Sequence, residues 1–285
     1  MTRLRELEQH RHSLADIREI MNSMKTLAYM ETRKLVRFLD AQHTVVQSIE
    51  DVAADLLSFY PETLPEVKET TTVYLLIGTE RGFCGDFNHA LLKNLESTLQ
   101  AHSVGKPMLV VVGRKLYNLL VTDARMVAAT NGASVVEEVP DLLSQAVSEL
   151  MTIQEKHDGL TVYCLYHDAE EVIVLKRLLP PFQGFLNRPP HFPHPPVLNQ
   201  SPPGFLAELT EHYLFAALHE MLYTSLMAEN YKRVRHLEGA VKKLDDESYD
   251  LSQQCNALRQ EEIIEEIEIL LLNTGNLDES KHKGK

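Results

Sequence analysis

Tryptophan is absent from this sequence of 285 residues, and cysteine occurs only three times. Cys84, Cys164 and Cys255 lie far apart along the chain. This arrangement offers neither the close spacing of metal ligands nor a framework of paired cysteines, which small secreted proteins use. We therefore expect a protein of a reducing compartment without a structural metal ion.

Long apolar runs and positive charge are also scarce. No stretch of 18 apolar residues occurs, so the sequence predicts no membrane-spanning helix. The first residues, Met1 to Arg5, lack the apolar core and the cleavage site of a signal peptide. The net charge of -13 at pH 7 argues against nonspecific nucleic-acid binding, because such binding neutralises phosphates.

Glycine and proline are both missing from residues 1–60. Apolar residues recur there mostly at steps of three and four, and charges occupy the other faces, which is the pattern of an amphipathic helix. The sequence predicts one helix of about 90 Å. Pro61 and Pro65 end it, because proline cannot continue the hydrogen-bond ladder. The alternative is two shorter helices with a break near residues 30–34.

Residues 205–273 contain no proline, and Gly239 is their only glycine. They predict a second helix, about 100 Å long. Part of it places apolar or small residues at alternating steps of four and three, which is the a/d seam of a coiled coil. These residues are Leu237, Val241, Leu244, Ser248, Leu251, Cys255 and Leu258. A seam of this length requires a partner helix.

The sequence between the two helices has a different character. Residues 66–180 alternate β-prone runs with helical patterns, which is typical of an α/β domain with a largely parallel sheet. Strands are expected at residues 72–78, 107–113, 125–130, 160–166 and 171–179. Helices are expected at residues 87–102, 114–121 and 141–157, the last with Asp141 as its N-cap.

The expected architecture follows from the order of these parts. Residues 181–204 are rich in proline and form an extended linker from the domain to the second long helix. If both long helices leave the domain on the same side, they run antiparallel and each covers the other's seam. The predicted fold is therefore an antiparallel coiled coil plus a central Rossmann-like α/β domain. Residues 274–285 are expected to form a flexible tail.

One glycine-containing loop resembles a phosphate-binding site in its position. Gly78-Thr-Glu-Arg-Gly-Phe-Cys-Gly85 lies between an expected strand and an expected helix. However, it lacks both the Walker A lysine and the Gly-x-Gly-x-x-Gly spacing, and the acidic Glu80 and Asp86 would repel phosphate. A tight strand-to-helix turn is the simpler interpretation.

Other reactive side chains give weak signals. Cys84 could act as a nucleophile with His89 or His167 as its base, but no spacing rule connects them. His191 and His194 could bind a metal, but two histidines in a proline-rich linker without an acidic neighbour more simply belong to a solvated loop.

Two basic clusters stand out from the acidic background. The first contains Arg33 and Lys34, and the second contains Lys232 and Arg233. Such charges usually solvate helix faces, but they could equally meet acidic loops of a partner protein.

Three motifs, together with the order of the elements, resemble the gamma subunit of F-type ATP synthases. They are Ile17-Arg-Glu-Ile-Met-Asn-Ser-Met-Lys25 with the pair Arg33-Lys34, the Gly78–Gly85 loop with Asn88, and Asn256-Ala-Leu-Arg-Gln-Glu-Glu-Ile-Ile-Glu-Glu-Ile267. The sequence departs from the family pattern at Asp86, which replaces a glycine, and at Ala240-Val-Lys-Lys243. These departures suggest a divergent or alternate branch of the F-type ATPases.

The resemblance implies a non-catalytic rotor, without a cofactor, in the central stalk. Such a rotor couples ion flow through the membrane sector, for example of protons, to ATP synthesis or hydrolysis in the alpha/beta head. The implied partners are the alpha and beta subunits, the epsilon subunit and the c-subunit ring, with one copy of this chain per complex. The implied location is peripheral, on the cytoplasmic face of a bacterial inner membrane.

The resemblance also implies a contact site. Arg259 and Gln260 match the family pair that hydrogen-bonds a loop of the beta subunit. Arg33, Lys34, Lys232 and Arg233 form a candidate basic patch for further partner contact.

Two other classes of function fit the same residues. One is a small α/β enzyme with coiled-coil arms that uses Cys84, and the other is a coiled-coil scaffold without a rotary role. A rotor subunit co-purifies with ATPase alpha and beta subunits, whereas such an enzyme loses its activity on Cys84→Ser. A scaffold shows neither property.

Overall fold

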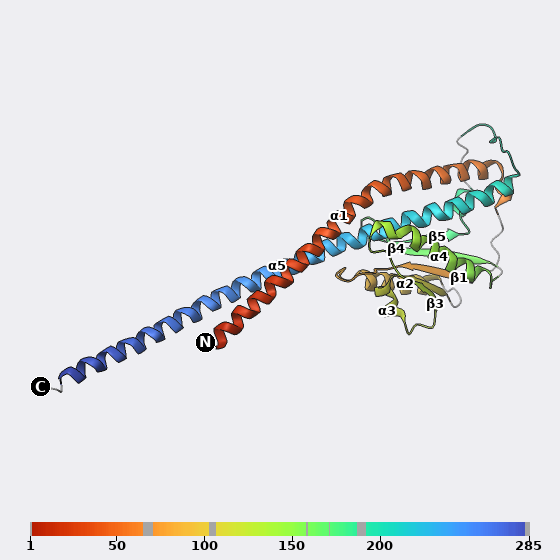
Figure 1. The fold of residues 1–285 in the computed structure, drawn as a ribbon. Helices are drawn as coiled ribbons and strands as arrows, with labels where there is room; N and C mark the ends of the chain where they lie inside the picture. The colour runs from red at the N-terminus through yellow and green to blue at the C-terminus, as the bar shows by residue number, and fades with distance from the viewer. Residues whose placement is uncertain are drawn as a thin grey trace. The chain divides into compact units, whose positions relative to one another are not determined.

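The computed structural model describes residues 2–64, 71–102, 107–157, 159–170, 172–186 and 192–282 (Figure 1). Its backbone contacts divide the chain into two compact units. The helical unit comprises Met1–Thr26 and Arg235–Lys285, and the mixed unit comprises Leu27–Val234.

Helix α1 spans Thr2–Phe59 and continues through residues 30–34 without a break, as the single-helix interpretation predicts. It ends at the proline-containing turn η1, Pro61–Thr63. Helix α5 spans Pro202–His282 and therefore runs beyond the expected end at Asn273. Residues 274–282, which the sequence analysis assigned to the tail, are helical in the structure.

In the helical unit, α1 and α5 form an antiparallel pair. Arg18 forms an ion pair with Asp245, and Arg259 Nη2 lies 2.7 Å from Glu8 Oε1. Residue numbers therefore rise along α5 in the direction in which they fall along α1. The predicted seam is confirmed by burial: its buried members are Leu237, Val241, Leu251 and Cys255, and its partly buried members are Leu244, Ser248 and Leu258. On α1, Leu14 is buried, whereas Ile17 is 43% exposed.

The mixed unit contains a five-stranded sheet in the order β3-β2-β1-β4-β5. The strands are β1 (Thr71–Ile77), β2 (Met108–Val112), β3 (Met126–Thr130), β4 (Leu160–His167) and β5 (Ile173–Leu179). Neighbouring strands pair in parallel except β4 and β5, which are antiparallel. The largely parallel α/β sheet predicted from the sequence is confirmed.

Three further helices follow the strands: α2 (Phe87–His102), α3 (Arg114–Leu120) and α4 (Val139–Gln154). Short turns of 3-10 helix, η2 (Val136–Glu138) and η3 (Gln183–Phe185), complete the described elements. The prediction that Asp141 caps α4 is wrong. The helix starts at Val139 with a proline in its first turn, and Asp141 lies inside that turn. Proline favours this position because its amide would lack a partner there anyway.

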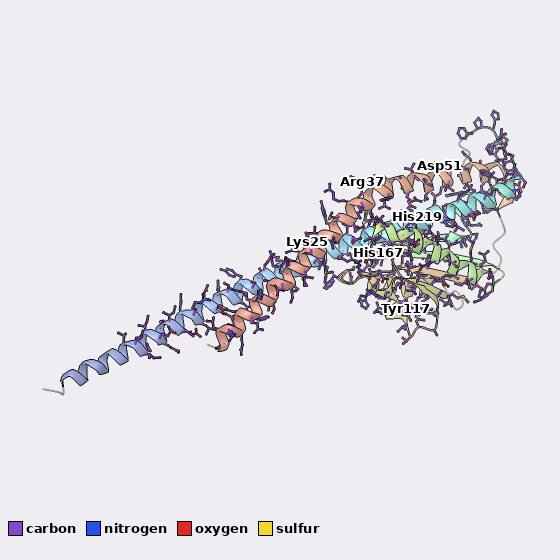
Figure 2. All side chains as sticks on the ribbon, in the orientation of Figure 1. Lys25, Arg37, Asp51, Tyr117, His167 and His219 are labelled. Carbon is purple, nitrogen blue, oxygen red and sulfur yellow. The ribbon has the colours of Figure 1, made fainter. Side chains whose placement is uncertain are left out.

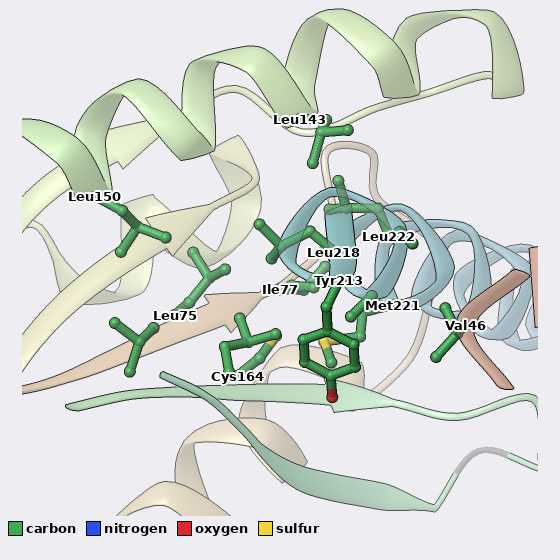
Figure 3. Close-up of a cluster of buried hydrophobic side chains, with 14 of the residues drawn as sticks. Val46, Leu75, Ile77, Leu143, Leu150, Cys164, Tyr213, Leu218, Met221 and Leu222 are labelled. Atoms are coloured by element: carbon green, nitrogen blue, oxygen red, sulfur yellow. The ribbon is translucent and has the colours of Figure 1, made fainter. Parts of the chain in front are cut away.

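Alternate residues of the strands supply two hydrophobic layers, as expected for a sheet covered on both faces. Tyr74 and Leu76 of β1 pack against α2 and α3. Leu75 and Ile77 of the same strand lie in the larger core with α4 and with the parts of α1 and α5 that belong to the mixed unit (Figure 3). The long helices are therefore integral to the core of the mixed unit.

A polar cluster also joins β5 to both long helices in the mixed unit. Lys176 Nζ of β5 lies 3.5 Å from Glu50 Oε1 of α1 and 3.9 Å from Glu220 Oε2 of α5. His43 Nδ1 lies 2.7 Å from Glu220 Oε1. These contacts fix α1, α5 and the sheet edge to one another.

Candidate functional site

The Gly78–Gly85 segment is a tight turn between β1 and α2. A Cβ atom on Gly78 would lie 2.4 Å from Leu116 Cβ, so only glycine fits there. Asn88 closes the turn: the Thr79 amide donates to Asn88 Oδ1 at 3.1 Å, and Asn88 Nδ2 donates to Thr79 Oγ1 at 2.9 Å. This geometry supports the strand-to-helix turn interpretation.

Glu80, from this loop, holds the start of α3. Its Oε2 accepts hydrogen bonds from the amides of Arg114 at 2.9 Å and Gly132 at 2.8 Å. The Arg114 guanidinium also lies 3.5 Å from Glu80 Oε1. The acidic side chain that would repel phosphate therefore has partners within this chain.

Cys84 is buried and held as a neutral thiol. Its Sγ donates to the carbonyl oxygen of Gly82 at 3.4 Å and lies 3.9 Å from Glu229 Oε1. Burial, reinforced by the Glu229 carboxylate, raises the pKa of the Cys84 thiol to about 12. Since the thiolate is the nucleophile, this environment disfavours an enzyme that depends on Cys84.

Glu229 and Arg233 form an ion pair one turn apart on α5, and both are nearly inaccessible, at 3% and 4% exposure. Arg233 also donates through Nε to the carbonyl oxygen of Gly82 at 3.2 Å and through Nη1 to Asn230 Oδ1 at 2.7 Å. The pair is thus hydrogen-bonded to the loop as well as internally. Burial raises the pKa of Glu229 to about 7, against the opposing effect of Arg233.

Lys232 extends this network towards the start of α2. Its Nζ donates to Asp86 Oδ1 at 2.9 Å and lies 5.9 Å from the centre of the Phe87 ring. Phe87 in turn stacks on His167 with ring centres 3.8 Å apart, and its carbonyl oxygen lies 3.0 Å from His167 Nε2. We call the whole set the loop–α5 clamp: Gly82, Cys84, Asp86, Glu229, Asn230, Lys232 and Arg233.

The clamp has the properties of a structural joint. Its central charges are paired and buried, so removal of one partner would leave an uncompensated charge, which is strongly destabilising. Its thiol is protonated and hydrogen-bonded to a carbonyl. It holds the β1–α2 loop to α5 within the mixed unit.

Arg259 and Gln260 lie in the helical unit. Arg259 pairs with Glu8, and the two side chains are 54% and 41% exposed. Gln260 is exposed. Between residues 263 and 271 of α5, six apolar side chains have exposures of about half or more: Ile263, Ile264, Ile267, Ile269, Leu270 and Leu271.

Comparisons with known proteins identify the family. A family model described as ATP synthase matches residues 3–270. The ATP synthase gamma chain of Clostridium botulinum (strain Langeland / NCTC 10281 / Type F) is 21% identical over 270 residues, which cover 90% of this chain and 91% of that protein. The chain belongs to the ATP synthase gamma family.

Further members and solved structures agree. The gamma chain of Caldanaerobacter subterraneus subsp. tengcongensis is 20% identical over 280 residues, covering 90% of this chain and 93% of that one. A chain of the Euglena gracilis mitochondrial ATP synthase (OSCP/F1/c-ring) superposes with a TM-score of 0.65 at 14% identity, covering 98% and 96% of the two chains. A chain of the Tetrahymena thermophila central stalk/c-ring structure gives 0.56 at 17% identity, covering 78% and 99%.

Membership of the gamma family defines the general role of the chain. It is a gamma subunit of the ATP synthase central stalk, a non-catalytic and peripheral subunit of a membrane-bound complex. Over the part of the chain that the structure describes, no helix combines the length and apolar character needed to cross a membrane.

The structure places the four residues of the candidate basic patch in different environments. Arg33 is exposed. Lys34 Nζ lies 2.9 Å from Glu31 Oε1 and 3.1 Å from Glu137 Oε1, which raises the pKa of Lys34 through these hydrogen bonds. Lys232 and Arg233 belong to the loop–α5 clamp. Arg233 is enclosed by the chain itself, so partner contact through this patch is a proposal for Arg33, Lys34 and Lys232.

Sequence reasoning missed Glu229 and Asn230. The sequence shows only that Glu229 and Arg233 are four positions apart, that Asn230 follows Glu229, and that apolar residues surround them in the helix. That spacing is common on solvated helix faces. Only the tertiary structure reveals that the β1–α2 loop covers this face and buries the pair. His191, one of the two histidines weighed as metal ligands, lies outside the described residues.

Proposed function

We propose that this gamma subunit is the rotor of an F-type ATP synthase. In this role it couples ion flow through the c-subunit ring to ATP synthesis or hydrolysis in a head of alpha and beta subunits. The epsilon subunit and the c ring are its partners beside the α/β domain. One copy serves each complex, because one shaft lies on the axis of the head.

The end of α5 carries this proposal. The helices α1 and α5 run antiparallel, and Arg259 of α5 pairs with Glu8 of α1. The first residues of α1 therefore lie beside α5 roughly two turns beyond Arg259. The apolar residues beyond that point, such as Ile267 and Ile269, are 50% and 58% exposed. An apolar helix face in water marks an interaction surface, and in the proposed complex this face lies inside the bore of the alpha/beta head.

The physical mechanism follows from asymmetry. A shaft with one charged and one apolar side presents a different surface to each of three equivalent catalytic sites, whatever its rotation angle. Each contact shifts the conformational equilibrium of a site by its differential affinity for the two conformations. Rotation then moves the same bias from site to site, and a stiff helix pair transmits the torque.

We further infer that Arg259 and Gln260 contact a loop of the beta subunit. The pair of Arg259 with Glu8 is half exposed, and exposed ion pairs contribute only about 0–1 kcal/mol. Exchange of Glu8 for a carbonyl or carboxylate of a partner therefore costs little. Gln260, exposed on the same turn, supplies a neutral donor and acceptor.

Purification of the native complex through a tag on this chain tests both proposals. The alpha and beta subunits should co-purify, and the isolated chain should hydrolyse no ATP. In the assembled complex, Arg259→Ala with Gln260→Ala should lower ATP hydrolysis while the isolated variant retains its helix content by circular dichroism. Absence of the alpha and beta subunits from the preparation would contradict the rotor proposal itself.

Glu8→Gln separates the two roles of Arg259. This change removes the intrachain ion pair but keeps the guanidinium. If Arg259 acts on the beta subunit, Glu8→Gln leaves ATP hydrolysis near the wild-type rate. If the intrachain pair is what matters, Glu8→Gln reproduces the loss seen in the double variant, and the contact assignment fails while the rotor proposal stands.

We also propose that the chain lies on the cytoplasmic face of a bacterial inner membrane, held there by its partner subunits. The suggestion of a divergent F-type branch rests on Asp86 and on Ala240-Val-Lys-Lys243. Asp86 pairs with Lys232 in the loop–α5 clamp, so the residue that replaces the family glycine has a partner within this chain.

A further inference from the structure

One histidine of α5 lies in the packing between the two long helices of the mixed unit. Figure 2 labels this residue, His219, on the stretch of α5 that runs beside α1. On one side of it, Gln42 of α1 donates to the carbonyl oxygen of Ala216 at 3.1 Å. On the other side, Phe38 of α1 lies against Tyr223, with ring centres 5.7 Å apart. The His219 ring stacks on Tyr223 at 4.7 Å, so three rings join the helices.

The Nε2 atom of His219 is shielded from solvent and has no hydrogen-bond partner in the described part of the chain. A neutral imidazole tolerates this position when its proton is on Nδ1, because Nε2 then carries only a lone pair. A protonated imidazole carries a hydrogen on both ring nitrogens. It would therefore place an unsatisfied N–H group and a positive charge in the packed contact, and both are costly.

The charged groups near this stretch of α5 pair with one another rather than with His219. The pairs join Glu220 to His43 and Lys176, Glu50 to Lys176, and Lys34 to Glu31 and Glu137.

The remaining titratable groups supply no counter-ion either. Arg37 and Asp40 of α1 are exposed. Burial raises the pKa of three nearby tyrosines and keeps them neutral: Tyr166, Tyr213 and Tyr223. Among the described residues, a protonated His219 therefore has no partner for its new charge.

Burial of His219 also sets the direction of the pH effect. It lowers the pKa of the imidazole below its ordinary value of 6.5. As pH falls below that value, a locally opened chain takes up the proton before the packed chain does. Acid therefore favours opening of this contact, and neutral pH favours packing.

We propose that His219 makes the packing of α1 on α5 sensitive to acid: when the imidazole takes up a proton, its ring leaves the contact to reach water, and the helices separate locally. Loss of the stack on Tyr223 also releases the contact of Tyr223 with Phe38, so one proton acts on both helices. The packing then changes over the pH range in which histidine titrates. This proposal does not depend on the rotor proposal, since both segments belong to the mixed unit.

Hydrogen exchange of the full-length chain at about pH 8 and about pH 5, corrected for the intrinsic exchange rate, tests the proposal. Opening of residues 36–46 and 213–225 should increase about threefold or more at the lower pH. In His219→Phe, which keeps a ring but takes up no proton, this increase should be absent. His219→Gln, which is neutral and of different shape, should also lack it, so the test holds if phenylalanine does not fit.

Two other histidines serve as controls. His212 is exposed on the same helix, so His212→Gln should respond to pH like the wild type. His43→Gln removes the other imidazole at this contact, whose Nδ1 lies 2.7 Å from Glu220 Oε1, and should keep the acid response. In the NMR spectrum of the wild-type chain, His219 should titrate at a lower pH than a histidine of the unfolded chain.

Three results would overturn the proposal. A wild-type acid response in both His219 variants would show that another group senses the proton. Loss of the response in His43→Gln would assign it to the ion pair with Glu220. Titration of His219 at the pH of an unfolded-chain histidine would show that the packing does not oppose protonation.

Discussion

At the scale of single residues, the most unusual group is Glu229, a carboxylate that is 3% exposed beside an equally buried arginine. Its desolvation outweighs its attraction to Arg233, because burial raises the pKa of Glu229 to about 7. Taking two charges out of water costs several kcal/mol, which mutual attraction repays only in part. The hydrogen bond from Arg233 to the carbonyl oxygen of Gly82 shows what the pair provides instead: a fixed position for the β1–α2 loop.

This pKa shift predicts a pH dependence of stability. Below the unfolded pKa of Glu229, near 4.5, the group is protonated in both states and adds no penalty. As pH rises from about 4.5 to about 7, the unfolded state releases the proton while the folded state keeps it, so the free energy of unfolding falls, by up to about 3 kcal/mol. Glu229→Gln should remove this fall. Urea unfolding of both proteins across this pH range measures it.

A matched control uses an exposed carboxylate on the same helix. Glu238→Gln should leave the slope of unfolding free energy against pH like that of the wild type. A Glu229→Gln variant with the wild-type slope would show that Glu229 titrates at an ordinary pKa in the folded chain.

At the scale of elements, α5 has two different segments within the helical unit. Between Leu237 and Leu258 its seam is buried or partly buried, and from Ile263 to Leu271 its apolar side chains are exposed. The first segment therefore contributes to folding and the second has the composition of a binding surface. The sequence already indicates this division, because the a/d spacing ends at Leu258.

Truncation of the chain after Leu258 separates these roles. Of the removed residues, those from Arg259 to Leu271 bury little surface within the chain, so thermal unfolding of the isolated protein should change by only a few degrees. In the assembled complex, the same truncation should reduce the coupling of ion pumping to ATP hydrolysis. Measurement of both in parallel decides the matter: a truncated chain that fails to fold would instead make this segment part of the core.

The elements themselves could be predicted from the sequence where one physical effect dominates. The absence of glycine and proline defined α1, and the a/d spacing from Leu237 to Leu258 defined the seam. Boundaries were less predictable: Asp141 has a good capping side chain, but the proline before it sets the start of α4 two residues earlier. The end of α5 also differs, because the helix reaches His282 whereas the sequence placed its end at Asn273.

At the scale of the whole molecule, the sequence predicted the coiled coil, the parallel sheet and the gamma family, because hydrophobic periodicity and three motifs cover most of the chain. It could not predict the loop–α5 clamp. The clamp depends on which faces of distant segments meet, and the four-residue spacing from Glu229 to Arg233 does not indicate which segment covers the pair. A site formed by the approach of a loop to a helix becomes visible only in three dimensions.

The central claim is that this chain turns inside an alpha/beta head, and single-molecule rotation tests it most directly. Met151 on α4 is 61% exposed, whereas the three native cysteines are buried, so Met151→Cys offers one accessible thiol for a bead. The complex is fixed to a surface through its beta subunits and supplied with ATP. We predict continuous rotation of the bead in one direction. A bead that stays still while the same immobilised complexes hydrolyse ATP would contradict the account.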